Sequence, residues 1–272
     1  MLTACSEETA KSIIGLLEAI LSGSQTTVTT PEQPDGLDGI PATEQSLLEL
    51  PADVRGSVTV SYSGYTSSYN QKTLIPDWVA YELTSDETYG DEERGDRMFS
   101  MDKRVKGPQA MREDYSDSGW TKGHMAPASD FRWSADAMDD TFHFTNVCPQ
   151  NEYLNGNDWE YLERQVRSWA KQFGKVWVTT GPVIGTNKYG CIGERDVVVP
   201  DAFFKAVLAF KNGKYKAIAF VMGNDEQRYW LQDCAVSVDD VEKLTGLDLY
   251  PALDDAIEES VESQISLSFW GI

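Results

Sequence analysis

Histidine and cysteine are scarce in this chain of 272 residues, which contains two histidines and four cysteines. The cysteines stand at positions 5, 148, 191 and 234, and no two of them have the Cys-x-x-Cys spacing. With so few ligands, a structural zinc site is not expected. The sequence also lacks any run of 18 apolar residues, so it predicts no transmembrane helix.

Basic residues are few as well, because 23 Lys and Arg stand against 44 Asp and Glu, which gives a formal net charge of −21. A global field of this sign repels nucleic acid and anionic lipid, and it excludes polyanion binding by bulk charge. The acidity lies mostly at the two ends: residues 1–57 carry −7, residues 223–272 carry −10 and residues 58–222 carry only −4. Any anion-binding site is therefore expected in the middle region.

The composition of the chain changes near residue 57. Residues 7–21 have apolar side chains at helical spacing and predict a short amphipathic helix, whereas residues 22–51 are rich in Ser, Thr, Gly and Pro and predict a linker. We therefore expect an N-terminal tether over residues 1–56 and one folded domain over residues 57–272.

The folded region has alternating patterns typical of strands at residues 57–62, 78–83 and 175–180. Two further apolar runs, at residues 202–210 and 215–222, flank Asn212-Gly213, and Asn-Gly between such runs is a strong hairpin signal. Helical patterns lie between some of these strands. Together they predict an α+β fold that consists of a mostly antiparallel sheet with packed helices.

Residues 120–163 are dense in polar side chains that neither a strand nor a helix period explains. His124 follows Lys122 and Gly123 in a segment without a clean period, and catalytic groups are common in such loops and strand ends. Taken alone, a single histidine of this kind is more often a hydrogen-bonded structural residue. The residues that follow it in the chain therefore decide between the two interpretations.

The chain beyond His124 is expected to form a strand and then a turn. Phe142–Asn146 alternates like a half-buried strand, which predicts that His143 is a surface residue. Gln150 and Asn151 are expected to be turn residues, at the start of a polar connection that extends to residue 155.

A helix is predicted to begin near residue 158, because Asn157 and Glu160 have the spacing of a capping box. Its buried face is predicted from four apolar residues at helical spacing, namely Trp159, Leu162, Val166 and Trp169. Asn155 lies just before this helix and Glu163 lies inside it. At about 1.5 Å per residue they are at most roughly 12 Å apart along the axis, so both can face one cavity.

These residues, taken as a set, resemble the DNA/RNA non-specific endonucleases of the ββα-metal type. Members of that family carry Asp-Arg-Gly-His, Leu/Met-Ala-Pro-Ala, Thr-Phe, Asn-x-x-Pro-Gln, a metal-binding Asn, a Trp and Leu-Glu. The corresponding residues occur here in the same order and spacing: Lys122-Gly123-His124-Met125-Ala126-Pro127-Ala128, Thr141-Phe142, Asn146–Gln150, Asn155, Trp159 and Leu162-Glu163. The resemblance implies a ββα-metal active-site motif within the α+β fold.

The resemblance also implies a reaction, which is the hydrolysis of phosphodiester bonds in DNA and RNA without sequence preference. His124 would be the general base, and Asn155 would bind Mg²⁺, or Mn²⁺ in its place. Glu163 would hydrogen-bond the water shell of the ion, and Asn146 would orient His124 or the phosphate. Lys122 would offer positive charge to the phosphate. Activity should fall as the pH drops through the His124 pKa, which is ordinarily near about 6.5.

One departure from the family pattern concerns the contact with phosphate. Thr121-Lys122 stands where the family usually has Asp-Arg, so a forked guanidinium becomes a point charge. We expect this change to affect efficiency and substrate preference more than the chemistry. Arg164 and Arg167 lie in one of the least acidic stretches and are the other expected substrate contacts. With few phosphate contacts, binding should be weak and its salt dependence shallow.

Two alternatives to a nuclease stay open at this point. The first is a catalytically weakened module with the same fold that binds nucleic acid or a protein partner. The second is a metal-dependent phosphodiesterase for small substrates. Cleavage of long DNA in the presence of Mg²⁺, Mn²⁺ or EDTA distinguishes the three.

The cysteines carry the expectations about compartment and disulfides. Leu2-Thr3-Ala4-Cys5 resembles the end of a bacterial lipoprotein signal, which predicts a bacterial cell-envelope or extracellular protein that is lipid-anchored through Cys5. Cys148 lies inside the catalytic motif and is expected to be a buried thiol. A disulfide is then expected between Cys191 and Cys234.

Overall fold

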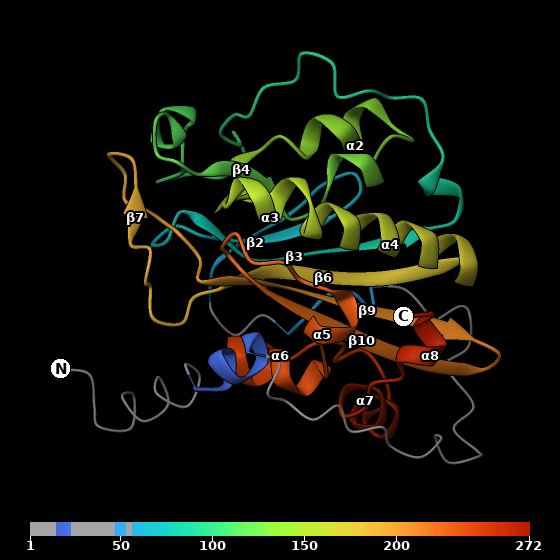
Figure 1. Ribbon diagram of the computed structural model, residues 1–272. Helices are drawn as coiled ribbons and strands as arrows, with labels where there is room; N and C mark the ends of the chain where they lie inside the picture. The colour runs from blue at the N-terminus through green and yellow to red at the C-terminus, as the bar shows by residue number, and fades with distance from the viewer. Residues whose placement is uncertain (1–14, 23–46, 53–55) are drawn as a thin grey trace.

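The computed structural model describes residues 15–22, 47–52 and 56–272 (Figure 1). Its centre is one seven-stranded sheet in the order β1-β2-β3-β6-β9-β10-β11, and every neighbouring pair in it is antiparallel. The strands are β1 (Val58–Ser61), β2 (Thr66–Asn70), β3 (Ile75–Thr84), β6 (Lys175–Val183), β9 (Ala202–Lys211), β10 (Lys214–Gly223) and β11 (Ala235–Val236). The α+β class and the mostly antiparallel sheet are confirmed.

The hairpin between β9 and β10 forms where Asn212-Gly213 predicts it. Lys211 pairs with Lys214, and the two residues between them have φ of 53° and 79°. Both values lie in the left-handed region, as a type I′ turn requires, and Asn and Gly are the residues that tolerate it best. This turn fixes the register of β9 and β10, two of the three longest strands in the sheet.

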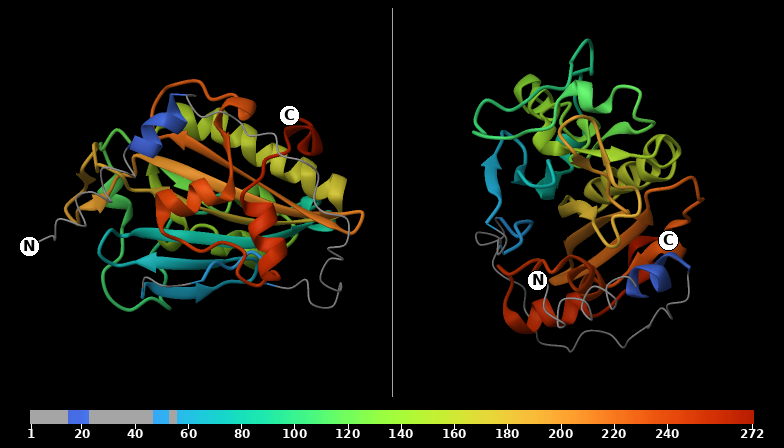
Figure 2. Two further views of the ribbon diagram at one scale, coloured as in Figure 1. Left: turned by 90° about the horizontal axis from the view of Figure 1, so that it is seen from below. Right: turned by 90° about the vertical axis from the view of Figure 1, so that its left-hand side faces the viewer.

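Both faces of the sheet are covered, so its central strands are apolar at nearly every position. One face packs against α2 (Ala135–Asp140), α3 (Glu152–Gly156) and α4 (Asp158–Phe173). The other face packs against α6 (Val238–Thr245), α7 (Asp255–Glu262) and the helical residues 15–21. Figures 1 and 2 show these two layers on opposite sides of the sheet.

The remaining elements are short. Near the site lie β4 (Thr121–His124), β5 (Val147–Gln150) and the 3-10 helices η3 (Arg112–Tyr115), η4 (Ala128–Asp130) and η5 (Phe144–Asn146). Elsewhere lie η2 (Asp86–Thr88), β7 (Cys191–Ile192), β8 (Val197–Val198), α5 (Leu231–Cys234) and α8 (Leu267–Trp270). Within the described ranges, no helix is long and apolar enough to cross a membrane.

Residues ahead of position 57 also join the packed structure. Leu17 and Ile20 are buried against the sheet, and Leu48 is fully buried in the same cluster. The Thr179 hydroxyl donates to the Glu49 carbonyl at 2.6 Å. The packed unit therefore extends beyond residues 57–272, while most of the expected linker, residues 23–46, lies outside the described residues.

Three local predictions differ from the structure. Residues 142–146 form no strand, because they turn through η5 and the strand β5 begins only at Val147. The expected polar connection over residues 151–155 is the short helix α3, whose first turn is capped by the Asn151 side chain. Helix α4 begins at Asp158 as expected, but the Asn157 amide donates to the Tyr153 carbonyl and caps nothing.

The expected disulfide is absent, because Cys148, Cys191 and Cys234 are all free thiols. Cys191 is exposed on β7, whereas Cys234 is buried in α5. Cys148 is a buried thiol, as expected, and burial raises its pKa well above the ordinary value, which makes it a poor nucleophile. Cys5 lies outside the described residues.

Candidate active site

The site is built on the antiparallel pair of β4 and β5, which places His124 opposite Val147. The pair closes tightly around Gly123, because a Cβ there would stand 2.0 Å from the Gln150 Oε1 atom. Glycine is therefore required at this position. Together with α4, these two strands form the ββα unit that the sequence motif implies.

His124 lies at the end of β4 between two aromatic rings. The centroid of its ring is 5.0 Å from that of Phe99 and 5.1 Å from that of Phe142. Its Nε2 atom is buried and has no hydrogen-bond partner among the described residues. Burial, assisted by the nearby Arg94 guanidinium, lowers the pKa of His124 to about 3. The imidazole is thus neutral at physiological pH, the form that accepts a proton.

This low pKa corrects the expected pH dependence. A His124 pKa near 6.5 would place the loss of activity in the neutral range, whereas the observed environment moves this titration far below it. For the protein without bound substrate, an acid limb between pH 5 and 9 is therefore expected from another group.

Asn146 is wholly occupied in holding the chain next to His124. Its Oδ1 atom accepts from the Ala126 N–H at 2.8 Å, and its Nδ2 atom donates to the carbonyls of Ala126 and Thr141 at 2.9 and 3.0 Å. Both amide protons are used, so no donor is left for a phosphate. The structure therefore contradicts the expected contact between Asn146 and the phosphate. The role that stays open for Asn146 is to hold the backbone that follows His124.

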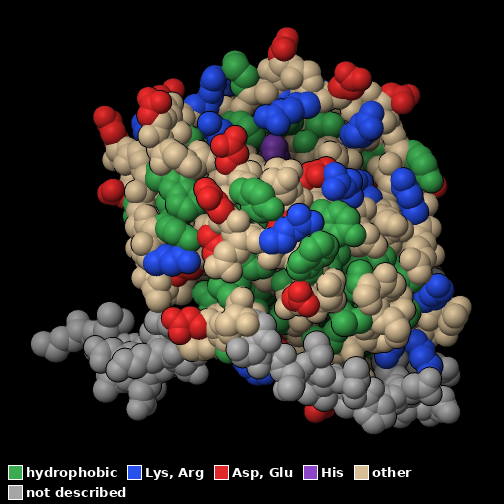
Figure 3. Space-filling view, in the orientation of Figure 1, with side chains coloured by type: hydrophobic (Ala, Val, Ile, Leu, Met, Phe, Trp, Pro, Cys, Tyr) green, Lys and Arg blue, Asp and Glu red, His purple; other side chains and the backbone are tan. Residues whose placement is uncertain are grey.

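His124, Asn155 and Glu163 line one cavity of about 380 Å³. They come from three different elements: β4, α3 and α4. Its wall also includes two basic residues, Arg94 and Arg132, and two acidic residues, Glu92 and Glu93. Figure 3 shows a histidine recessed in a hollow on this layer, with both basic and acidic side chains near it.

The Asn155 amide is oriented by a chain of hydrogen bonds. Its Nδ2 atom donates to the Thr121 hydroxyl at 3.1 Å, and that hydroxyl donates to the Gln150 carbonyl at 2.8 Å. The amide nitrogen is thereby held on β4, whereas Oδ1 accepts no hydrogen bond from a described residue. A single fixed carboxamide oxygen suits a Mg²⁺ ion, which keeps most of its waters. Thr121, which departs from the family pattern, thus orients the side-chain amide of Asn155 directly.

Glu163 has no hydrogen bond or ion pair with any described residue, although its carboxylate is largely enclosed. Burial raises its pKa, and the charges of Lys205 and Arg167 act in the opposite direction. An enclosed carboxylate without a partner, on the wall of a cavity, is available to bind an ion's hydration shell or a substrate water.

The two arginines expected to bind substrate are both paired within the protein. Arg167 lies 2.7 Å from the carboxylate of Asp130, which is fully buried and also accepts from the Tyr81 hydroxyl. Asp130 thus balances the charge of Arg167, which does not line the cavity. Arg164 is exposed and lies 2.7 Å from the Glu160 carboxylate, one helical turn away.

Lys122 lies two residues before His124 on β4 and is half-buried. Its ammonium lies 5.1 Å from the centre of the Tyr115 ring. Burial lowers the pKa of Lys122, and the nearby charge of Arg112 adds to the effect. It forms no ion pair with any described carboxylate, so its charge is available to an anion.

Sequence reasoning missed Arg94 and Arg132, the basic residues on the cavity wall. Arg94 follows two glutamates and therefore resembles part of a solvated acidic loop. In the structure its guanidinium lies 5.3 Å from the Phe142 ring, beside His124. Arg132 donates to the Glu92 carbonyl at 2.9 Å, which fixes the same loop to η4. The position of this loop depends on contacts with residues far away in the chain. No local sequence pattern therefore indicates that Arg94 lies at the site.

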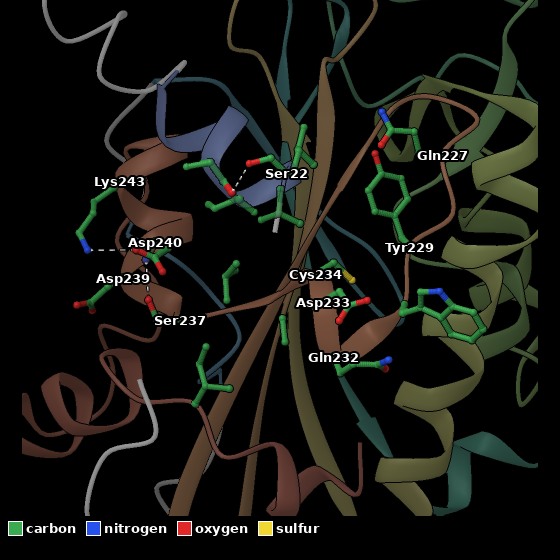
Figure 4. Close-up of a pocket in the computed structure, with 18 of the residues that line it drawn as sticks. Ser22, Gln227, Tyr229, Gln232, Asp233, Cys234, Ser237, Asp239, Asp240 and Lys243 are labelled. Atoms are coloured by element: carbon green, nitrogen blue, oxygen red, sulfur yellow. Dashed lines mark hydrogen bonds and ion pairs between the residues drawn. The ribbon is translucent and has the colours of Figure 1, made fainter. Parts of the chain in front are cut away.

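A larger cavity, of about 930 Å³, lies near α5 and α6 (Figure 4). Its labelled acidic residues include Asp240, which pairs with Lys243 at 3.4 Å. No histidine lines it, and it shares no residue with the cavity at His124. The chemistry expected from the sequence therefore belongs to the smaller cavity.

The sheet, the β4–β5–α4 unit and the polar cavity beside it define the class of ββα-metal nuclease folds. A family model described as DNA/RNA non-specific endonuclease matches residues 46–256. The chain belongs to this family.

Individual relatives agree with the family. The chain is 34% identical over 229 residues to a mitochondrial nuclease EXOG of Mus musculus, across 78% of this chain and 62% of the relative. It is 34% identical over 204 residues to mitochondrial endonuclease G of Homo sapiens, across 70% and 69%. The solved structure of an EndoG/EndoGI complex superposes with a TM-score of 0.69 at 28% identity, across 73% of this chain and 87% of that one.

The names of these relatives correct one expectation. EXOG of mouse, zebrafish, human and frog and human endonuclease G are all named as mitochondrial. This finding overturns the expected bacterial cell-envelope or extracellular location. The chain spans 62 to 64% of the length of the EXOG relatives.

The buried ion pair behind the cavity leads to a prediction about stability. Replacing Asp130 with Asn should destabilise the protein by about 3–5 kcal/mol, because it leaves Arg167 as an unpaired and largely buried charge. Urea denaturation measures the change. The matched control is Glu160→Gln, which breaks the exposed pair with Arg164 and should cost less than about 1 kcal/mol. Equal losses of unfolding free energy in the two variants would contradict the assignment of Asp130 and Arg167 as a buried ion pair.

Proposed function

We propose that this protein is a metal-dependent endonuclease that hydrolyses phosphodiester bonds in DNA and RNA without sequence preference. The observation that carries the proposal is the arrangement of His124, Asn155 and Glu163 around one cavity. Family membership and the printed names of the relatives support a nuclease. Hydrolysis of a phosphodiester needs an activated water, a cation at the phosphate and a protected space, and the site offers a group for each.

His124 takes the proton from the attacking water. Its ring enters the reaction neutral, because its surroundings disfavour the imidazolium form. Since Nε2 is buried without a partner, Nδ1 is the ring nitrogen that we assign to this step. The phosphate and the Glu163 carboxylate bring negative charge close to the ring, and this charge stabilises the imidazolium when it forms.

Asn155 would hold the metal through its side-chain amide oxygen, and Glu163 would accept hydrogen bonds from the water shell of the ion. The hydrogen bond from Asn155 to Thr121 supports this role, because it fixes the amide with its oxygen free. When bound, Mg²⁺ or Mn²⁺ supplies positive charge against the charge that develops on the phosphate oxygens and the leaving oxygen.

Lys122, Arg94 and Arg132 attract the phosphate locally, in spite of the net charge of −21. Contacts of this kind reach the sugar–phosphate backbone and carry no base information, so cleavage is tolerant of sequence. A small number of contacts also keeps the salt dependence of binding shallow.

The first test is cleavage of a plasmid and of a long RNA with Mg²⁺ by wild type and by His124→Ala. Loss of the general base should lower kcat/KM by about 10²–10⁴-fold. The control is His143→Ala, because His143 lies outside the cavity and should be dispensable. An active wild type that is unaffected by His124→Ala would defeat the assignment. Binding without cleavage would favour the binding module, and cleavage of small diesters alone would favour the phosphodiesterase.

The second test concerns the metal ligand. Asn155→Ala should raise the Mg²⁺ concentration needed for half-maximal activity by at least about tenfold. Asn157→Ala removes the same side chain two residues away, on a residue that is exposed and outside the cavity, and should leave the Mg²⁺ requirement unchanged. The same Mg²⁺ dependence in both variants, or activity in EDTA, would show that Asn155 holds no essential ion.

The third test is the pH profile. Because burial raises the pKa of Glu163 above its ordinary value of about 4.3, its charged form is lost on acidification at a higher pH than usual. Activity should therefore fall as pH decreases through the Glu163 titration, while His124 stays neutral. In Glu163→Gln the activity should be about 10–100-fold lower and this limb should vanish. A limb that persists in the variant would assign it to another group.

A further inference from the structure

Lys205 is a fully buried lysine in the middle of β9, at a place that the proposed chemistry does not use. Its ammonium makes one long hydrogen bond, at 3.4 Å, to the Met125 carbonyl. It also lies 4.9 Å from the centre of the Trp159 ring. No described carboxylate lies within ion-pair distance of it. Such a charge is costly to bury, so its retention calls for a specific role.

The two contacts of Lys205 place it between the elements that carry the site. Met125 directly follows His124 at the end of β4. Trp159 lies four residues before Glu163 on α4, so the two side chains share one face of that helix. Lys205 does not line the cavity itself. Its ammonium therefore lies outside the cavity, between the end of β4 and α4.

The charges behind the cavity form a balanced set of four. Arg167 is neutralised by its ion pair with Asp130. Glu163 and Lys205 remain, and each is the largest charged influence on the other. Two more groups face this set: Glu160, which pairs with Arg164 at the surface, and Tyr81, whose hydroxyl donates to Asp130. Lys205 is thus the counter-charge that Glu163 would otherwise lack.

We propose that Lys205 is a positioning residue, which supplies the counter-charge of the Glu163 carboxylate from outside the cavity. This inference rests on the proposed function, because it assigns Glu163 its role in that reaction. The electrostatics agree with the geometry: burial raises the pKa of Glu163 and lowers that of Lys205, and each charge moves the pKa of the other back toward its ordinary value.

The test is a double-mutant cycle with Lys205→Met, Glu163→Gln and the two combined, assayed on plasmid DNA with Mg²⁺. Lys205→Met should lower kcat/KM by about 10–100-fold and move the acid limb of the pH profile to higher pH. In the Glu163→Gln background, the same substitution should change activity by less than about twofold, because its effect passes through Glu163. Lys175→Met, on the neighbouring strand β6, is the control and should leave both quantities unchanged.

Equal factors in the two backgrounds, or an acid limb that does not move, would overturn the proposal and make Lys205 a purely structural residue. Thermal unfolding shows whether each variant is folded, and Lys205→Gln replaces Lys205→Met if the latter is not, since the amide can still donate to the Met125 carbonyl. The double variant restores charge balance, so it should unfold at a higher temperature than either single variant.

A measurement without turnover separates this inference from the proposed function. The carboxyl carbon of ¹³C-labelled Glu163, assigned by its absence in Glu163→Gln, is followed by NMR as pH is varied. Its pKa should rise in Lys205→Met or Lys205→Gln relative to wild type, and an unchanged pKa would reject the role of Lys205. An inactive wild type in which this shift occurs would defeat the proposed nuclease and leave the link between the two side chains standing.

Discussion

The antiparallel pairing of β4 with β5 is the constraint on which the site depends. It sets His124 at a strand end and brings Thr121 beside the carbonyl of Gln150. That contact in turn fixes the amide of Asn155 on the next helix. The pairing requires glycine at position 123, because a Cβ there would collide with the Gln150 side chain. One tight strand pair thus orients the proposed base and the proposed metal ligand together.

The electrostatics of the molecule are local. Its net charge of −21 comes largely from the two ends of the chain, while the cavity is lined by Arg94 and Arg132 together with Glu92, Glu93 and Glu163. In the interior next to the cavity, Arg167 is paired with Asp130. The positive charges of Lys205 and Arg167 partly offset the cost of enclosing the Glu163 carboxylate. A protein of this overall charge can therefore present a site suited to an anion.

The sequence predicted what local patterns encode. The central strands and the β9–β10 hairpin were predictable from apolar runs and from Asn212-Gly213, but β2 was not, because the segment Thr66–Asn70 has buried serines in place of apolar residues. The motif predicted three residues that share the cavity, His124, Asn155 and Glu163, but not the arginines on its wall.

The partners of individual charged side chains were not predictable. Arg167 and Asp130 are 37 residues apart in the chain, so nothing local shows that they form a buried ion pair. Lys205 stands in an apolar run and is the kind of residue that normally marks the solvent side of a strand. Its burial follows only from the layer of helices packed over the sheet.

The most direct test of the proposed active site is a crystal structure with Mn²⁺ and a non-cleavable phosphorothioate DNA duplex. The proposed site of His124 and Asn155 predicts an anomalous Mn²⁺ peak at the Asn155 Oδ1 atom and a backbone phosphate bound to the ion. It also predicts that His124 Nδ1 faces that phosphate through a water. Mn²⁺ bound away from Asn155, or DNA that leaves the His124 cavity empty, would contradict it.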